Sequence, residues 1–341
     1  YKVDDRRADN LLVIHYKGKI NYFYIFGGKD ERSQDLIQGI TLAGILFDEV
    51  ALMPESFVNQ AVARCSVEGS KLWFNCNPSG PMHLFKVNWI DKAGEKNLLY
   101  LHFTMDDNLS LSEKVKERYR RMYAGVFFKR FILGLWVMAE GIIYDMFDEL
   151  KHVIDCAMCG HDEYGVAVDY ATASVMTFGL YGVQYDPNGK GEHKVFLIKE
   201  YYWDAQKKGR QKTDSEFAED FKVFLGDIVP RFIYVDPSAA SFKLELKKKG
   251  YGQVRDADND VVNGIRLVGT FLNTMRFFID RSCTDTIKET TSYSWDPKAQ
   301  ARGEDKPLKQ NDHSQDRNRY FIYTRFGKTA ARAIGNKPAG Y

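Results

Sequence analysis

Two apolar runs in the second half of the chain each end in an aspartate: GVAVD at residues 165–169 and FIYVD at residues 232–236. Short apolar runs rich in β-branched and aromatic residues are typical of buried strands. A carboxylate at the end of such a strand is costly to bury unless it binds a partner. Because neighbouring strands lie about 5 Å apart, Asp169 and Asp236 can converge on one point. Mg²⁺ or Mn²⁺ would suit that point, since these ions prefer oxygen ligands.

The segments around these two runs extend the pattern into an α/β fold. Patterning and turn residues predict strands at 164–169, 174–183, 194–203 and 231–235 and helices at 213–225 and 238–249. Farther along the chain, they predict a helix at 261–272, a strand at 276–279, a helix at 284–293 and a final helix from about residue 312. The order βββ-α-β-α with acids at strand ends is the pattern of the RNase H-like fold, a mixed sheet flanked by helices.

A third acidic element, NDHSQD at residues 311–316, lies at the start of the predicted final helix. His313 and Asp316 are i,i+3 neighbours there and Asp312 and Asp316 are i,i+4 neighbours, so one face offers a carboxylate with an imidazole or two carboxylates. For Asp312 a second interpretation is open, because an acidic N-cap also favours the helix dipole. We therefore predict a two-metal site in which Asp169, Asp236, His313 and Asp316 are ligands and the three aspartates are catalytic. Asp312 is a further candidate ligand.

Clusters of basic residues fit a polyanionic substrate for such a site. Phosphate contacts of this kind give salt-dependent binding that is largely blind to base sequence. For each cluster alone, a solvated helix face or a frayed terminus is an equal alternative. The candidate DNA-binding residues are Lys243, Lys247, Lys248 and Lys249 on the helix after Asp236, and Lys207, Lys208 and Arg210 in a preceding loop; a basic tail follows at 327–341.

The composition is that of a globular protein of more than one domain. The chain has 341 residues, 44% of them hydrophobic, and a formal net charge of +2, so total charge does not reveal a nucleic-acid partner. Five cysteines spread over this length argue against a disulfide framework and for a reducing compartment. Cys156 and Cys159 lie near His152 and His161, and a structural zinc or ordinary thiols are the two interpretations, because a second separated ligand pair is missing. No apolar run has the length of a membrane span.

The first half of the chain carries features of an ATPase. An apolar strand at 44–47 runs into Asp48-Glu49, the Walker B arrangement, in which the aspartate holds Mg²⁺ and the glutamate polarises the attacking water. A second strand at 71–75 ends in the turn NPSGP, and this pair resembles an ATPase coupling motif with Asn77 as its polar residue. The phosphate loop G-x-x-x-x-G-K-[ST] is absent. We therefore expect the chain to begin inside the ATPase domain.

Short motifs in a fixed order run through nearly the whole chain. They are LFDE at 46–49, NCNPSG at 75–80, DNLS at 107–110, ILGLW at 132–136, EGIIY at 140–144, VDY at 168–170, VDPS at 235–238, YSWD at 293–296 and NDHSQDRNRY at 311–320. In their order and spacing the chain resembles the large subunit of tailed-phage terminases, which packages DNA into procapsids.

The resemblance implies a domain order and a set of partners. It implies an ASCE, RecA-like P-loop ATPase, present here in part at 1–138, a linker at 139–160, an RNase H-like nuclease at 161–326 and the basic tail. It further implies Glu49 as the catalytic glutamate, Asp48 and Asn77 at the nucleotide with its Mg²⁺, and Mg²⁺ or Mn²⁺ at the nuclease. The implied partners are concatemeric double-stranded DNA, the portal protein, the terminase small subunit and further copies in a ring, with the monomer as the alternative in solution. The implied location is the host cytoplasm at the procapsid portal.

Two other functions are consistent with part of the pattern. A resolvase or transposase of RNase H-like fold would use the same carboxylates but leaves Asp48-Glu49 and the turn after residue 75 unexplained. A non-catalytic docking subunit from a decayed prophage would bind DNA or the portal without metal-dependent cleavage.

Overall fold

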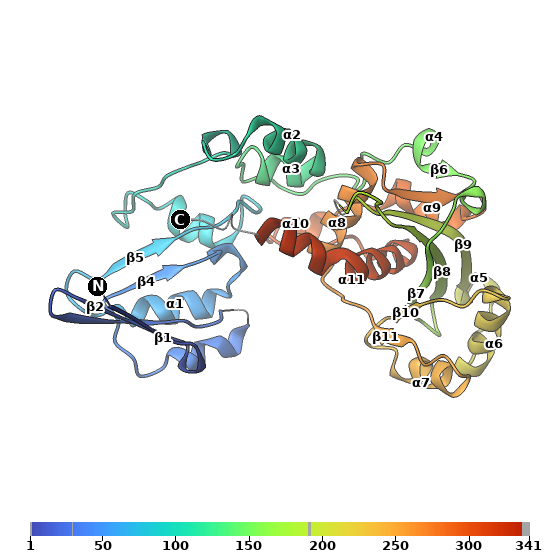
Figure 1. Cartoon of the computed structure of the whole chain (residues 1–341), viewed down its shortest axis with the longest axis horizontal. Coiled ribbons are helices and arrows are strands. Elements are labelled where there is room, and N and C mark those ends of the chain that lie inside the picture. The colour runs from blue at the N-terminus through green and yellow to red at the C-terminus, as the bar shows by residue number, and fades with distance from the viewer. Residues whose placement is uncertain (1, 29, 190–191, 336–341) are drawn as a thin grey trace. The chain divides into compact units, whose positions relative to one another are not determined.

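The computed structural model describes residues 2–28, 30–189 and 192–335, and it divides into two compact units after Leu101 (Figure 1). Of the predicted basic tail, residues 336–341 lie outside the described residues, and the preceding ones continue the last helix. The described helices include none long and apolar enough to cross a membrane.

The first unit contains two small sheets. Strands β1 (Lys2–Arg6), β2 (Leu11–Tyr16) and β3 (Lys19–Tyr24) form an antiparallel sheet in that order. Lys17 and Gly18 join β2 to β3 with φ angles of 48° and 75°, the left-handed pair that a tight hairpin needs. Strands β4 (Gly44–Phe47) and β5 (Lys71–Phe74) pair in parallel, with helix α1 (Glu55–Ala63) between them in the chain.

The second unit is built on a mixed seven-stranded sheet in the order β11-β10-β7-β8-β9-β12-β6. Its strands are β6 (Val153–Ile154), β7 (Glu163–Asp169), β8 (Val175–Gln184), β9 (Lys194–Asp204), β10 (Phe232–Val235), β11 (Val254–Asp256) and β12 (Phe277–Asp280). Strands β7, β8 and β9 form the predicted antiparallel meander. Strands β10 and β12 pair in parallel with β7 and β9, which makes the sheet mixed.

Helices cover both faces of this sheet (Figure 1). Helices α6 (Asp214–Leu225) and α7 (Ala240–Lys248) pack over one hydrophobic cluster, and α8 (Val261–Asn273) and α11 (His313–Gly335) pack over the other. Strand β7 contributes to both, with Val166 and Val168 in the first cluster and Ala167 in the second. Burial on both faces explains why β7 reads as a continuous apolar run.

The remaining helices are short. They are α2 (Glu113–Met122), α3 (Gly125–Phe131), α4 (Glu149–His152), α5 (Ala205–Lys208), α9 (Thr284–Ser292) and α10 (Pro297–Gln300). Short segments of 3-10 or π helix cover Arg7–Asp9, Glu31–Ile37, Val50–Leu52, Lys86–Ile90, Met105–Asp107 and Cys156–Met158.

Helices α2 and α3 belong to the second unit, although the sequence assigns them to the ATPase part. Asn273 of α8 donates to the carbonyl of Arg121 at 2.7 Å, and buried Arg130 forms an ion pair with Asp305. These contacts explain why the compact units divide after Leu101, earlier than the predicted linker. The functional domain boundary at 139–160 stays a prediction.

Candidate functional site

The two strand-end aspartates lie on neighbouring strands at the same edge of the sheet. Val235 of β10 is in register with Val168 of β7, so each strand reaches its aspartate at the same level. The backbone amide of Asp236 donates to the carbonyl of Val168 at 3.2 Å, which continues the pairing by one residue. Asp169 and Asp236 therefore lie together at one edge of the sheet, as their places at the strand ends predict.

Helix α11 brings an imidazole onto this edge. His313 is its first residue, and its Nδ1 lies 2.9 Å from Oδ2 of Asp169. Burial raises the pKa of Asp169 to about 6, the hydrogen bond from His313 opposes that rise, and the charges of Asp316 and Asp236 add to it. Burial alone would lower the pKa of His313, but the hydrogen bond and charge of Asp169 outweigh it and raise that pKa. The contact between Asp169 and His313 therefore favours the protonated form of the imidazole.

The other two predicted acids are bound by cations of the chain itself. The ammonium group of Lys309 lies 2.9 Å from Oδ2 of Asp312 and 2.9 Å from Oδ2 of Asp316. The guanidinium of Arg319 lies 3.0 Å from the second oxygen of Asp316. Sequence reasoning missed Lys309 and Arg319, although the spacing of Lys309 three and seven residues before these acids was readable from the sequence.

The side chains at this edge are of the types that bind a divalent metal. Two carboxylates and an imidazole at one sheet edge, with a third carboxylate close enough to raise the pKa of Asp169, have the chemistry that Mg²⁺ or Mn²⁺ takes. Within residues 2–28, 30–189 and 192–335, however, no three His, Cys, Asp or Glu side chains converge closely enough to enclose an ion. Oδ2 of Asp169 is engaged by His313, and the two oxygens of Asp316 are engaged by Lys309 and Arg319. The described residues likewise form no zinc cluster at Cys156 and Cys159, and Cys156 is buried.

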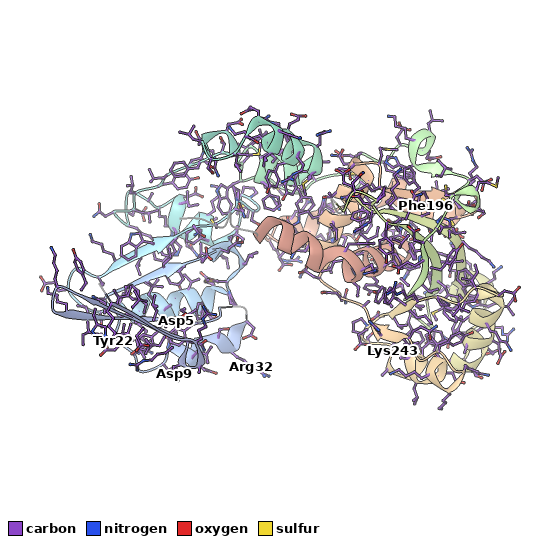
Figure 2. All side chains as sticks on the ribbon, viewed as in Figure 1. Asp5, Asp9, Tyr22, Arg32, Phe196 and Lys243 are labelled. Carbon is purple, nitrogen blue, oxygen red and sulfur yellow. The ribbon has the colours of Figure 1, made fainter. Side chains whose placement is uncertain are left out.

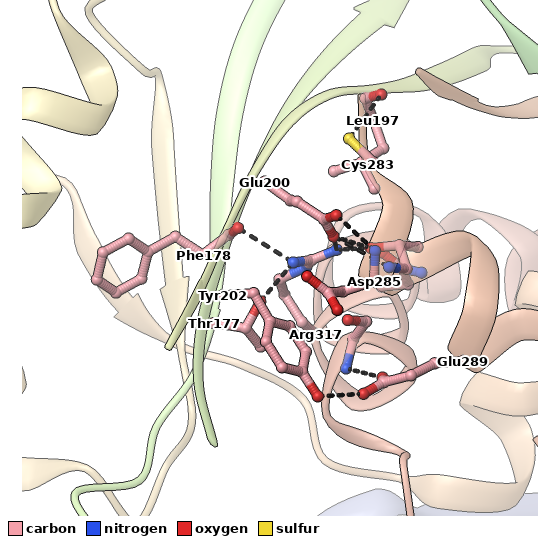
Figure 3. Close-up of polar contacts among 12 residues, drawn as sticks. Thr177, Phe178, Leu197, Glu200, Tyr202, Cys283, Asp285, Glu289 and Arg317 are labelled. Carbon is pink, nitrogen blue, oxygen red and sulfur yellow. Dashed lines mark hydrogen bonds and ion pairs between the residues drawn. The ribbon is translucent and has the colours of Figure 1, made fainter. Parts of the chain in front are cut away.

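A buried polar network fixes the helix that carries His313 and Asp316 (Figure 3). Arg317 is fully buried and donates to Thr177, to the carbonyl of Phe178 and to Thr286. Glu289 of α9 accepts the backbone amide of Ser314 at 2.7 Å, in the first turn of α11. Burial raises the pKa of Glu289. The sequence did not predict a role for these residues, because their partners lie on distant segments of the chain.

Most of the predicted DNA-binding cations already have acidic partners. Lys243, which is labelled in Figure 2, forms an ion pair with Asp256 of β11. The other pairs are Lys249 with Glu219, Lys248 with Glu245, Lys207 with Asp204 and Arg210 with Glu216. In the described chain, Lys247 and Lys208 are exposed and take part in no ion pair within 4.0 Å. These two are therefore the freest of the predicted phosphate contacts.

The first unit holds the Walker B-like residues in a loop stabilised by Asn75. The side-chain amide of Asn75 donates to Asp48 at 2.9 Å, and its oxygen accepts the backbone amide of Glu49 at 2.8 Å. Glu49 has a φ angle of 60°, a left-handed conformation that is rare for this residue type and that Asn75 helps to hold. Asn77, the residue chosen from sequence, is exposed two positions farther along. Asn75 is thus the polar residue that links the two strand ends.

Together the fold and the carboxylate edge define a class of α/β protein. Its first unit bears a Walker B-like strand pair, and its second unit is a mixed sheet with acids along one edge. The family model described as "Terminase large subunit, T4likevirus-type, N-terminal" matches residues 6–151. The chain is similar to the large terminase of a thermophilic bacteriophage, with 59% identity and a TM-score of 0.88 over 95% of this chain and 79% of that one. The chain belongs to the phage large-terminase family.

Two further comparisons bear on this assignment. A structure of the same thermophilic-phage terminase in complex with ADP is 58% identical, with a TM-score of 0.86, and covers 95% of this chain and 79% of that one. The large terminase subunit of Escherichia phage T5 is 24% identical over 304 residues, 82% of this chain. The chain spans 65% of the length of that relative.

Proposed function

We propose that the second unit is an RNase H-like, metal-dependent endonuclease that cuts concatemeric double-stranded DNA during phage genome packaging. The observation that carries the proposal is the meeting of Asp169, Asp236 and His313 at one sheet edge, with Asp169 and His313 in direct contact. Acids on neighbouring strand ends with a ligand-bearing helix across them are suited to phosphodiester hydrolysis.

The chain's own residues have separable roles in this proposal. Asp169, Asp236, Asp316 and His313 would hold Mg²⁺ or Mn²⁺, which when bound supplies an activated water and charge stabilisation at the phosphate. The pair of Asp169 and His313 can hold a proton at Oδ2 or Nδ1, because these two atoms lie 2.9 Å apart and the pKa of each group is raised. The buried network of Arg317 and Glu289 keeps α11 in place, so the helical ligands face the strand ends.

We further propose that the first unit is part of an ATP-driven motor. Asp48 would hold the Mg²⁺ of ATP and Glu49 would orient the attacking water, with Asn75 and Asn77 in the coupling loop. The complexes of the similar thermophilic-phage protein with ADP and with ATP-gamma-S support a nucleotide ligand. The proposed partners are double-stranded DNA, the portal protein, the small subunit and further copies in a ring, with a monomer in solution as the alternative. The proposed place of action is the host cytoplasm at the procapsid portal.

The nuclease proposal is tested by plasmid cleavage with the full chain, Mn²⁺ or Mg²⁺ and the variant Asp236→Asn. Asparagine keeps an oxygen for the amide and hydroxyl of Ser238, each 2.8 Å from Asp236, so the loop is retained while a metal-binding charge is lost. We expect wild-type cleavage to need the metal and the variant to lose at least about a hundredfold in rate, since a ligand charge is removed from the reaction centre. Asp227→Asn, an exposed acid elsewhere, is the matched control.

Equal cleavage by wild type and Asp236→Asn would remove the proposed site. A strong preference for branched DNA over linear duplex would instead favour a resolvase-type activity.

A further inference from the structure

One cation of the chain, Lys309, contacts carboxylate oxygens that a bound metal would need as ligands. The ammonium group of Lys309 is 2.9 Å from Oδ2 of Asp316 and 2.9 Å from Oδ2 of Asp312. Both carboxylates are buried, with side-chain exposures of 10% and 7%. Two buried acids four residues apart on one helix turn would repel each other without a shared counterion. Lys309 supplies that counterion.

The two cations on Asp316 differ in their freedom to leave. Arg319 is almost wholly buried, and its guanidinium is held at a second point by Asn259 at 2.9 Å. The side chain of Lys309 is 67% exposed and comes from the loop before α11. Its side chain is therefore mostly in solvent, while its ammonium group contacts the two acids. Of the two, Lys309 is the contact that can be exchanged.

A divalent ion on the same oxygen competes with this contact. A carboxylate oxygen can accept two partners, and Mg²⁺ or Mn²⁺ bonds to it at about 2.1 Å. An ion there and the ammonium group of Lys309, 2.9 Å from the same oxygen, would lie roughly 4 Å apart. Repulsion between like charges at such a separation weakens both contacts even with partial screening. The ion therefore binds through Oδ2 of Asp316 more tightly once Lys309 moves away.

We propose that Lys309 is an intramolecular competitor of the divalent metal, which releases Asp316 and Asp312 only when the ion replaces its ammonium group. This inference rests on the proposed nuclease function, because it concerns the occupancy of the same carboxylates. It adds a regulatory residue to the site. The metal ion and the ammonium group of Lys309 compete for the same pair of acids. The protein therefore binds the metal more weakly than the carboxylates would without Lys309.

The test measures Mn²⁺ binding to the full chain by isothermal titration and by electron paramagnetic resonance of the free ion. Lys309→Met removes the charge and keeps an unbranched side chain. The matched control is Lys306→Met, because Lys306 lies in the same loop, is 64% exposed and pairs with Glu304 instead of the site acids. We expect Lys309→Met to bind Mn²⁺ about tenfold more tightly than wild type, the factor given by a change of about 1.4 kcal/mol. Lys306→Met should match wild type.

A second measurement guards against misfolding of the variant. Loss of the counterion should lower the thermal midpoint of Lys309→Met, and saturating Mn²⁺ should raise it by more than it raises that of wild type, because a bound ion stabilises the folded state. Lys309→Arg, which keeps the charge, should restore the wild-type affinity.

The outcomes separate this inference from the nuclease proposal. Saturable Mn²⁺ binding with the same affinity in wild type and Lys309→Met would overturn the competition and leave the metal site standing. Absence of saturable binding in both proteins would overturn the metal site and the competition with it.

Discussion

Arg317 is the buried residue whose replacement gives the sharpest test of how the site is held. Its side chain has no exposure to solvent, and its guanidinium donates to Thr177 at 2.5 Å and to Thr286 at 2.6 Å. It also donates to the carbonyl of Phe178 at 3.1 Å and to the hydroxyl of Tyr181 at 3.2 Å. Thr177 is the strand partner of Asp169, so Arg317 connects α11 to β8 directly beside the site.

The variant Arg317→Met keeps most of the side-chain volume and removes all four donated hydrogen bonds. The acceptors on β8 then remain buried without these donors. Glu200, 3.9 Å from the guanidinium, keeps the amides of Asp285 and Thr286 and the hydroxyl of Thr286 as donors. Breaking a buried charged network costs about 3–5 kcal/mol. For a domain of this size about 1 kcal/mol shifts the midpoint by roughly 2–4 °C, so the expected fall is about 6–20 °C.

The measurement is thermal and urea unfolding of the full chain, combined with hydrogen exchange of the amides in the first turns of α11. Arg302→Met is the matched control, because Arg302 is 61% exposed and lies 3.6 Å from Glu304 at the surface. We expect that control to cost less than about 1 kcal/mol. A loss below about 1 kcal/mol in Arg317→Met, with unchanged exchange in α11, would refute the view that this network positions the helix.

Three further predictions rest on single contacts. Asn75→Ala removes the hydrogen bonds to Asp48 and Glu49. The Glu49 amide should then exchange faster, with a loss of about 1 kcal/mol in its protection free energy, whereas Asn77→Ala should leave its exchange unchanged. Gly264→Ala adds a methyl group that overlaps the aliphatic stem of buried Arg319; the overlap costs about 1–3 kcal/mol against a helix-propensity gain of about 1 kcal/mol, so a lower unfolding midpoint is expected and a raised one would contradict it. The pKa of Asp169 is raised by burial from 3.8 to about 6 and that of His313 is raised beside it, so the stability that both protonated groups contribute is present at low pH and lost as pH rises through these folded pKa values. The stability of Asp169→Asn relative to wild type should therefore increase by about 2–3 kcal/mol as pH rises from 4 to 7. Urea unfolding at several pH values that shows no such increase would disprove this.

The sequence predicted the centre of the sheet because its signals there are local. Strands β7 and β10 are continuous apolar runs ended by an acid, and the meander of β7, β8 and β9 has clear turns between its strands. These strands and the helices α6, α7, α8, α9 and α11 are confirmed by the structure.

The edges of the sheets were not predictable in the same way. Strands β6 and β11 contain two and three residues, too few for any periodicity to emerge. Strand β6 forms because its longer neighbour β12 offers backbone groups for pairing along its edge, and β11 forms beside β10 for the same reason. Strand β1 has the sequence KVDDR, four of whose five residues are charged, and it pairs with β2 beside it. Tertiary context, more than local propensity, formed these elements.

The candidate site combines both kinds of information on one helix. His313 and Asp316 stand out by their spacing, but Arg317 and Arg319 beside them read as ordinary surface charges until the fold buries them. Consecutive residues on a helix point in directions about 100° apart, so a helix that presents ligands on one face must place their neighbours in the core. A cation so placed needs acceptors, and β8 and α9 supply them. Substitutions in this buried network should therefore alter metal binding without touching a ligand, because α11 cannot shift against β8 without moving His313 relative to Asp169.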